Sequence, residues 1–218
     1  MEKKIEYYFD FLSPYSYLSW TWFREEIQKL KDKGYAIEFI PVSLAQVITS
    51  YETKGPAEIE TKRNYLFKDC LRKSLKRGVP FVLPRNLPFN SLYVLRMIMA
   101  ADESQKESLI DLFFRAGWEF GKDIGDSDPL EEILNEAGHP ASDLLERVGS
   151  KEMRKAIKDN NQRALARGVF GVPSFYVEGE LFWGDDSKEF FCDFVNGKDK
   201  YNEDEYNYFA KNYPIMNS

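Results

Sequence analysis

The sequence predicts an α/β fold in which a split β-sheet is interrupted by a helical insertion. Three observations predict it: a β-α-β pattern over residues 5–42, long helical segments between residues 45 and 168, and two short apolar runs over residues 173–183 that restore strand character. The 218 residues, 43% of them apolar, can bury a substantial core. One enlarged domain is therefore favoured over two small ones.

The first element is an aromatic and β-branched run over residues 5–11, which predicts a strand. Ser13 and Pro14 follow it and predict the start of a helix, because serine caps free backbone N–H groups and proline tolerates the first helical position. We expect this helix over about residues 14–33. Residues 36–42 predict a second strand, and a crossover helix of this kind joins parallel strands.

The middle of the chain has the periodicity of helices, and strand character returns after it. Two apolar runs around Glu178-Gly179-Glu180 predict a hairpin, and residues 187–195 predict a closing helix. The segment after Asn196, rich in Tyr, Asn and acids, is expected to be a peripheral helix or a loose tail. The other expected helices are 58–77, 91–101, 106–120, 129–137 and 151–167. The expected division is a discontinuous domain of residues 1–44 and 169–197, a helical insertion of residues 45–168, and a C-terminal extension of residues 198–218.

Charge and composition exclude several classes of partner. The formal net charge is -6, and 30 basic residues are scattered among 36 acidic ones, so no positive stripe is available for a phosphate backbone. We expect no nucleic-acid partner. The first residues lack the apolar core and cleavage site of a signal peptide, and no apolar stretch approaches the roughly 20 residues of a membrane span. A cytoplasmic protein with no membrane partner is therefore predicted.

The cysteines and the histidine predict neither a redox dithiol nor a metal site. Cys70 and Cys192 are far apart and form no C-x-x-C pair, so both are interpreted as apolar filler. His139 stands in a Gly-His-Pro turn, and metal sites usually need three or four converging ligands. We expect His139 on the surface and no metal.

Ser13 is the first candidate for chemistry. The pattern places its hydroxyl where a strand leads into the positive end of a helix, and free N–H groups and the helix dipole both favour an anion there. The alternative that Ser13 only caps the helix stays open.

The second candidate is Val172-Pro173, which directly precedes a predicted strand. Pro173 cannot donate to the sheet, so an ordinary strand start is one interpretation. The other is a cis bond, which occurs at about 5–6% of such positions in folded proteins and exposes backbone groups at a tight turn. Those groups would hold a peptide-like ligand as an added strand.

The third candidate is the acidic pair Asp185 and Asp186 at the start of the last predicted helix. Acids favour helix N-termini, so Asp185 as a simple cap is one interpretation. The functional alternative is that a carboxylate of the pair receives an ammonium group from a ligand.

Together these motifs resemble a known family. Residues 9–17 (FDFLSPYSY), 87–92 (LPFNSL), 168–175 (GVFGVPSF) and 180–184 (ELFWG) are similar to those of 2-hydroxychromene-2-carboxylate isomerases and kappa-class glutathione transferases. The resemblance covers about residues 4–195. It implies a DsbA-like thioredoxin fold, with residues 1–44 and 169–197 as the thioredoxin-like domain, and glutathione as the cosubstrate.

The resemblance also implies roles for single residues. Ser13 stands at the nucleophile position of the family and would stabilise the glutathione thiolate without attacking. Val172 and Pro173 stand where the backbone pairs with the cysteinyl unit, and Asp185 and Asp186 where the γ-glutamyl end is received.

Two further positions have a less certain register. Lys62 resembles the basic residue that reaches the glycyl carboxylate, and Thr53 falls near a position that is often Asn. An exposed lysine is otherwise a solvated charge on a helix face. Ser187 departs from the pattern, because the family usually has Arg there. We expect the neighbouring positive charge to be missing, which would make the acidic pair more negative and lower the affinity for glutathione.

The reaction implied by the resemblance is the glutathione-dependent isomerisation of an aromatic or conjugated carbonyl compound. A kappa-type transferase acting on a small electrophile and a noncatalytic thiol-binding scaffold stay open as alternatives. A homodimer is expected from the resemblance only. Four aromatic residues, Tyr15, Tyr17, Phe89 and Trp183, would suit a flat substrate, but a core role is expected for each.

Overall fold

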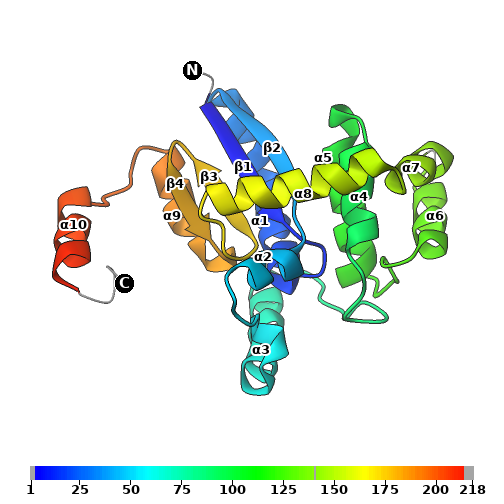
Figure 1. The fold of residues 1–218 in the computed structure, drawn as a ribbon, viewed down its shortest axis with the longest axis horizontal. Coiled ribbons are helices and arrows are strands. Elements are labelled where there is room, and N and C mark those ends of the chain that lie inside the picture. The colour runs from blue at the N-terminus through cyan, green and yellow to red at the C-terminus, as the bar shows by residue number, and fades with distance from the viewer. Residues whose placement is uncertain (1–2, 140, 214–218) are drawn as a thin grey trace. The chain divides into compact units, whose positions relative to one another are not determined.

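The computed structural model describes residues 3–139 and 141–213, and the chain divides into two compact units, Met1–Asp186 and Ser187–Ser218. The first unit contains a four-stranded mixed sheet in the order β2-β1-β3-β4 (Figure 1). Its strands are β1 (Lys3–Phe9), β2 (Tyr35–Pro41), β3 (Ser174–Val177) and β4 (Glu180–Trp183). β1 is parallel to β2 and antiparallel to β3, and β3 is antiparallel to β4. The predicted parallel pair and C-terminal hairpin are confirmed.

The helices of the first unit follow the predicted order. Two short ones, α2 (Leu44–Ser50) and α7 (Ala141–Val148), were not expected, because one or two turns are too short to show a helical period. The remaining helices of this unit are α1 (Pro14–Asp32), the 3₁₀ turn η1 (Pro56–Glu58), α3 (Glu60–Arg77), α4 (Leu92–Ala100), α5 (Glu103–Trp118), α6 (Ser127–Glu136) and α8 (Lys151–Ala166).

The second unit is helical. It holds α9 (Lys188–Val195) and α10 (Glu203–Asn212), and the 3₁₀ turn η2 (Asp185–Ser187) spans the boundary between the units. Of the two alternatives for the segment after Asn196, the structure has the helix. Asn202 caps α10 by accepting hydrogen bonds from the N–H groups of Asp204 and Glu205. Over residues 3–139 and 141–213, no helix has the length and apolar character that crossing a bilayer requires.

One face of the sheet carries an aromatic core. Tyr7 of β1 packs against Phe175 of β3 with ring centroids 4.9 Å apart, and Phe11, just beyond β1, packs against Phe114 of α5 at 4.6 Å. The indole Nε1 of Trp118 donates a hydrogen bond of 2.9 Å to the Phe11 carbonyl. The helical segment between the two halves of the sheet therefore shares one core with the strands, since α5 closes over the end of β1.

The opposite face packs against α2 and α8, which lies in front of the strands in Figure 1. Tyr8 and Ile40 pair in register across β1 and β2, and they form a buried apolar cluster with Ala164 of α8. Val172, in the loop before β3, belongs to the same cluster. This packing fixes the loop that carries Val172 against the end of the sheet.

A network of ion pairs continues this face toward the start of β1. Arg163 of α8 bonds to Glu6 of β1 at 2.6 Å and to Glu38 of β2 at 2.5 and 2.7 Å. Glu6 also accepts a hydrogen bond of 2.5 Å from the Tyr8 hydroxyl. The hydrogen bonds from Arg163 lower the pKa of Glu38 to about 2. The network therefore joins α8 to both parallel strands.

We predict that Arg163→Gln makes stability less dependent on acid pH. The pKa of Glu38 is lower in the folded chain than in the unfolded one, so its contribution is present above about pH 5 and is lost as the pH falls toward 2. The Arg163 and Glu38 side chains are 32% and 35% exposed, so we expect this pair to contribute about 1 kcal/mol. Urea unfolding from pH 7 to pH 3 measures it.

The matched control is Lys155→Gln on the same helix, where Lys155 and Asp159 form an ion pair with side chains 77% and 51% exposed. This variant should follow the wild-type pH profile. A profile for Arg163→Gln as steep as that of Lys155→Gln would contradict the prediction.

Candidate active site

The turn between β1 and α1 is held by Asp10, which is fully buried. Its carboxylate accepts a hydrogen bond of 3.0 Å from the Leu12 N–H and one of 2.8 Å from the Leu44 N–H. Burial raises the pKa of Asp10, and these two bonds act against that rise. Because Ser13 N–H also donates to the Asp10 carbonyl at 3.0 Å, the position of Ser13 is fixed by the turn.

Ser13 is the N-cap of α1, as one of the two interpretations predicts. Its Oγ accepts a hydrogen bond of 3.2 Å from the Ser16 N–H, and the residue is 4% exposed. The same hydroxyl donates to the Val172 carbonyl over 3.4 Å, which is long for a hydroxyl donor. The hydrogen bond that the Ser13 hydroxyl donates is therefore weak, and the hydroxyl lies at the positive end of a helix.

The loop opposite Ser13 contains the expected cis bond between Val172 and Pro173. That the backbone of this loop holds a peptide-like ligand stays a prediction. The Ser13 contact joins residues 159 positions apart in sequence. The Pro173 carbonyl accepts a hydrogen bond of 2.8 Å from Gly184 N–H, which ties this loop to the residue preceding the acidic pair. The first and last motifs are thus connected through the Val172-Pro173 loop.

Two exposed aromatic side chains border this loop. Trp183 is 53% exposed, and its ring lies 4.8 Å from that of Phe170. A Cβ at Gly171 would come within 2.7 Å of Trp183 Nε1, so glycine allows the indole to lie against the loop. The expected core role is wrong for Trp183, whereas Tyr17 and Phe89 are buried as expected. Trp183 therefore lies against Gly171 and the exposed ring of Phe170.

Asp185 is held in a buried ion pair. Its side chain is fully buried, and its two oxygens accept hydrogen bonds of 2.7 Å each from the guanidinium of Arg77. The Trp22 indole Nε1 lies 3.3 Å from one of these oxygens. Asp185 is therefore bonded to residues of α1 and α3, and its assignment as the group that receives a ligand ammonium stays a prediction.

Lys73 is the second cation in this part of α3. Its Nζ lies 3.3 Å from Asp69, 3.4 Å from Asp185 and in contact with Asp186. Burial acts to lower the pKa of Lys73, but the bond to Asp186 and the other carboxylates outweigh it and raise that pKa. Asp69 also accepts a hydrogen bond of 2.9 Å from the hydroxyl of half-buried Tyr15. This cluster links the first turn of α1 to the acidic pair.

The prediction that positive charge is missing beside the acidic pair is wrong. Residue 187 is serine, but Lys73 and Arg77 of α3 supply the cations from more than 100 positions away in sequence. The spacing Asp69-Lys73-Arg77 was a usable signal, because residues four apart lie on one face of a helix. That spacing does not reveal the partner of this face, and sequence reasoning missed all three residues.

Thr53 and Lys62 lie apart from these contacts in the structure. Both are exposed, Thr53 in the loop after α2 and Lys62 in the first turns of α3. Thr53 N–H donates to the Ile48 carbonyl at 3.5 Å. Their assignment to the glycyl end of glutathione stays a prediction.

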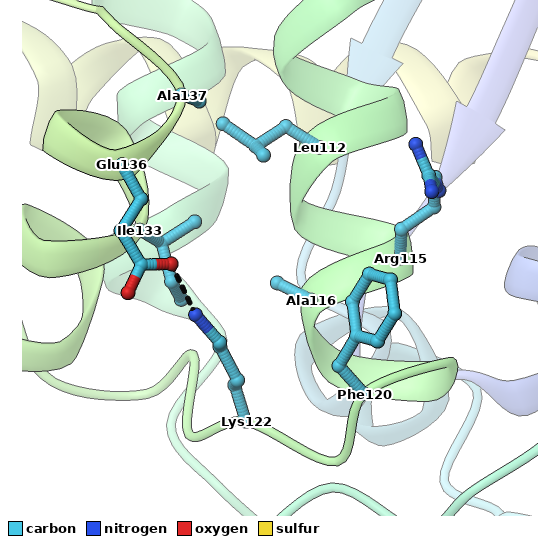
Figure 2. A pocket seen from close by; sticks show the side chains of 8 residues that line it. All are labelled: Leu112, Arg115, Ala116, Phe120, Lys122, Ile133, Glu136 and Ala137. Carbon is cyan, nitrogen blue, oxygen red and sulfur yellow. Dashed lines mark hydrogen bonds and ion pairs between the residues drawn. The ribbon is translucent and has the colours of Figure 1, made fainter.

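A cavity of about 200 Å³ opens between α5 and α6 (Figure 2). Its apolar floor includes Leu112 and Ile133, and Lys122 bonds to Glu136 at its rim. None of its lining residues belongs to the Ser13, Val172 or Asp185 groups. We nevertheless place the candidate site at Ser13, because polar groups converge there at the N-terminus of a helix. At the rim of the small cavity, by contrast, Lys122 and Glu136 pair with each other.

Comparison with known proteins gives the family. The model of the DsbA-like thioredoxin domain matches residues 4–196. A 2-hydroxychromene-2-carboxylate isomerase from Pseudomonas putida is 30% identical over 84% of this chain and 89% of that protein. Glutathione S-transferase kappa 2 from Caenorhabditis elegans is 27% identical over 80% and 81%. A solved 2-hydroxychromene-2-carboxylate isomerase has a TM-score of 0.78 and 26% identity, covering 89% of this chain and 95% of its own.

These relatives are named as isomerases and transferases, and the matches span most of each chain. The expected α/β fold is confirmed by the sheet order and by the family model together. The chain is an enzyme of the isomerase and transferase group, and it belongs to the DsbA-like thioredoxin domain family, within which it groups with the 2-hydroxychromene-2-carboxylate isomerases and the kappa-class glutathione transferases.

Proposed function

We propose that this protein is a glutathione-dependent isomerase of the 2-hydroxychromene-2-carboxylate isomerase type, in which Ser13 stabilises the glutathione thiolate. One observation carries the proposal: the Ser13 hydroxyl caps α1 and faces the Val172-Pro173 loop, where its Oγ lies 3.4 Å from the Val172 carbonyl oxygen. A thiolate is a stronger acceptor than a neutral carbonyl, so the hydroxyl turns to it when the two compete.

The residues at the site fit glutathione by the chemistry of their donors and acceptors. The Ser13 hydroxyl and the N-terminus of α1 suit a sulfur anion, and the backbone at Val172 suits a peptide unit. Asp186, whose side chain is 80% exposed, suits an ammonium group. One ligand that carries a thiol, peptide bonds and an α-amino group matches all three.

The energies are sufficient for thiolate formation. An unperturbed thiol has a pKa near 8.5 and is mostly protonated at neutral pH. A hydrogen bond to a charged group contributes about 1.5–3 kcal/mol and a helix dipole about 0.3–1 kcal/mol. At about 1.4 kcal/mol per pKa unit, Ser13 and α1 together lower a thiol pKa by about one to three units. The thiolate then predominates near pH 7.5.

Bound glutathione supplies a sulfur nucleophile that adds reversibly to a conjugated aromatic carbonyl compound. In this mechanism the Ser13 hydroxyl donates a hydrogen bond to the thiolate sulfur, keeps its proton and does not attack, and the first turn of α1 stabilises the negative charge. Trp183 and Phe170 offer exposed rings beside the loop for a flat substrate. The substrate is proposed to be an aryl pyruvate.

A kappa-type glutathione transferase is the second candidate, favoured by the similarity to relatives of that name. The two reactions share the thiolate and differ in its fate. An isomerase regenerates the thiol, whereas a transferase consumes it by forming a thioether with an electrophile.

The experiment is a calorimetric titration of reduced glutathione into the wild-type protein, with thiolate absorbance followed in the ultraviolet. We expect binding with a thiolate signal near pH 7.5. Incubation with aryl pyruvates and with electrophiles then separates the candidates, because a constant thiol concentration during turnover indicates the isomerase and a falling one the transferase. Absence of glutathione binding to the folded protein would contradict both.

A further inference from the structure

A second cavity, an open groove of about 880 Å³, lies at the start of β1, and we call it the β1 groove. The first residues of β1 extend past α8, which crosses the strands (Figure 1). Ser13 follows the opposite end of β1, so the groove is separate from the candidate active site. Its charged lining residues are Lys3, Lys4, Glu6, Arg163, Arg167 and Glu178.

The β1 groove is basic in a chain that is acidic overall. Among the residues that the structure describes, four cations and two acids line it, whereas the whole chain has a net charge of -6. One more acid, Glu38, pairs with Lys4 and Arg163. With Glu38 included, four positive charges stand against three negative ones, which leaves a net charge of +1. An anion is therefore the ligand that this charge favours.

The ion pairs form a chain of alternating charge that ends in a cation on both sides. At one end Lys4 bonds to Glu38 at 2.9 Å, and at the other Arg167 lies 3.2 Å from Glu6. Arg163 bonds to both carboxylates and joins the two halves. The Glu6 side chain is 5% exposed, whereas those of Lys4 and Arg167 are 48% and 42% exposed. A ligand in the groove therefore meets the two terminal cations and not the Glu6 carboxylate.

Arg167 is oriented by Tyr176 of β3. Its guanidinium carbon lies 4.4 Å from the centre of the tyrosine ring, and its Nη1 donates a hydrogen bond of 3.3 Å to the tyrosine hydroxyl. This bond and the one to Glu6 are both long and leave further N–H donors of the guanidinium open. An oriented guanidinium with open donors matches the geometry of a carboxylate or phosphate group.

Glu178 at the rim of the groove does not cancel these cations. Lys3 pairs with it at 3.2 Å, and the Tyr35 hydroxyl donates to it at 3.4 Å. The Glu178 carboxylate is thus balanced by its own lysine. Lys4 and Arg167 stay the cations that an anion in the groove can use.

We propose that the β1 groove binds a small organic anion whose carboxylate or phosphate group bridges Lys4 and Arg167. The bound oxyanion places a negative charge between the two cations at the ends of the alternating chain and offsets its net charge of +1. The volume of the groove is within the range of about 300–1,000 Å³ that is typical of small-molecule sites. Because both cations are about half exposed, the affinity falls as the ionic strength rises.

The test is a calorimetric titration of inorganic phosphate and of citrate into the full chain, in a chloride buffer of constant ionic strength. Backbone amide chemical shifts locate the bound anion. The proteins are the wild type, Lys4→Gln, Arg167→Gln and the matched control Lys158→Gln, which removes an exposed positive charge from α8 outside the groove. Circular dichroism and thermal unfolding establish that each variant is folded.

We expect at least one of the two anions to bind the wild type and Lys158→Gln with equal affinity and to shift the amides of Lys4 and Tyr176. Lys4→Gln and Arg167→Gln should each weaken binding about three- to tenfold, since each removes one half-exposed charged contact. Binding of phosphate alone indicates a ligand that carries a phosphate group, and binding of citrate alone indicates one that carries carboxylates.

Three outcomes overturn the inference. The first is that neither anion binds the folded wild type. The second is that Lys158→Gln loses as much affinity as the two groove variants, because the overall charge and not the groove then holds the anion. The third is that the amide shifts are confined to the Ser13 turn and the Val172-Pro173 loop. None of these outcomes bears on the proposed function, which glutathione binding tests separately.

Discussion

Arg77→Met is expected to lower the free energy of unfolding by about 3–5 kcal/mol, because it leaves the Asp185 carboxylate buried without its bidentate partner. Methionine fills most of the volume of the arginine stem, so the loss reports charge and hydrogen bonding more than packing. Lys73, 3.4 Å from Asp185, compensates in part and sets the loss toward the lower end of this range. Urea unfolding at pH 7 measures it.

Two further variants separate the ion pair from a general effect on α3. Arg72→Met changes an exposed arginine of the same helix and should shift stability by no more than about 0.5 kcal/mol. The double variant Arg77→Met with Asp185→Leu removes both charges and should recover much of the loss, because an apolar pair has no desolvated charge. A loss below 1 kcal/mol for Arg77→Met would mean that Asp185 is reached by water or fully served by Lys73.

Ser13→Ala is expected to remove the thiolate signal of bound glutathione at neutral pH and to lower the turnover rate about 10- to 100-fold. The reason is the loss of a hydrogen bond to a charged sulfur, worth about 1.5–3 kcal/mol. The remaining helix dipole continues to favour the anion weakly. A pH titration of thiolate absorbance at saturating glutathione measures the shift directly, and we expect the thiol pKa to rise by about one to two units in the variant.

Ser150→Ala is the matched control, since Ser150 caps α8 with the same geometry as Ser13 caps α1. In both helices the serine oxygen accepts a hydrogen bond of 3.2 Å from the N–H three residues on. Each variant should lose about 1 kcal/mol of stability from the missing cap. Only Ser13→Ala should change the thiol pKa, and equal pKa values in the two variants would reduce Ser13 to a structural cap.

In the first unit, the sequence predicts the elements that depend on neighbouring residues and misses those that depend on tertiary packing. The β1-α1-β2 unit was predictable, because strand composition, an N-capping serine and a helix-starting proline act within a few residues of one another. Most element boundaries agree within about three residues. The helices α2 and α7 were missed, because a short helix gains its stability from tertiary packing and leaves little periodic pattern.

The candidate site also combines features that neighbouring residues determine with features that depend on tertiary contacts. The sequence by itself determined that a serine begins α1, that a proline precedes β3 and that an acidic pair follows β4, because each depends on neighbouring residues. Only the tertiary structure decided that Ser13 and Val172 meet across the sheet end, that Arg77 buries Asp185, and that Lys73 stands beside Asp186. Ion pairs between distant segments leave no local signal, since the free energy that selects them arises only when folding removes both groups from water.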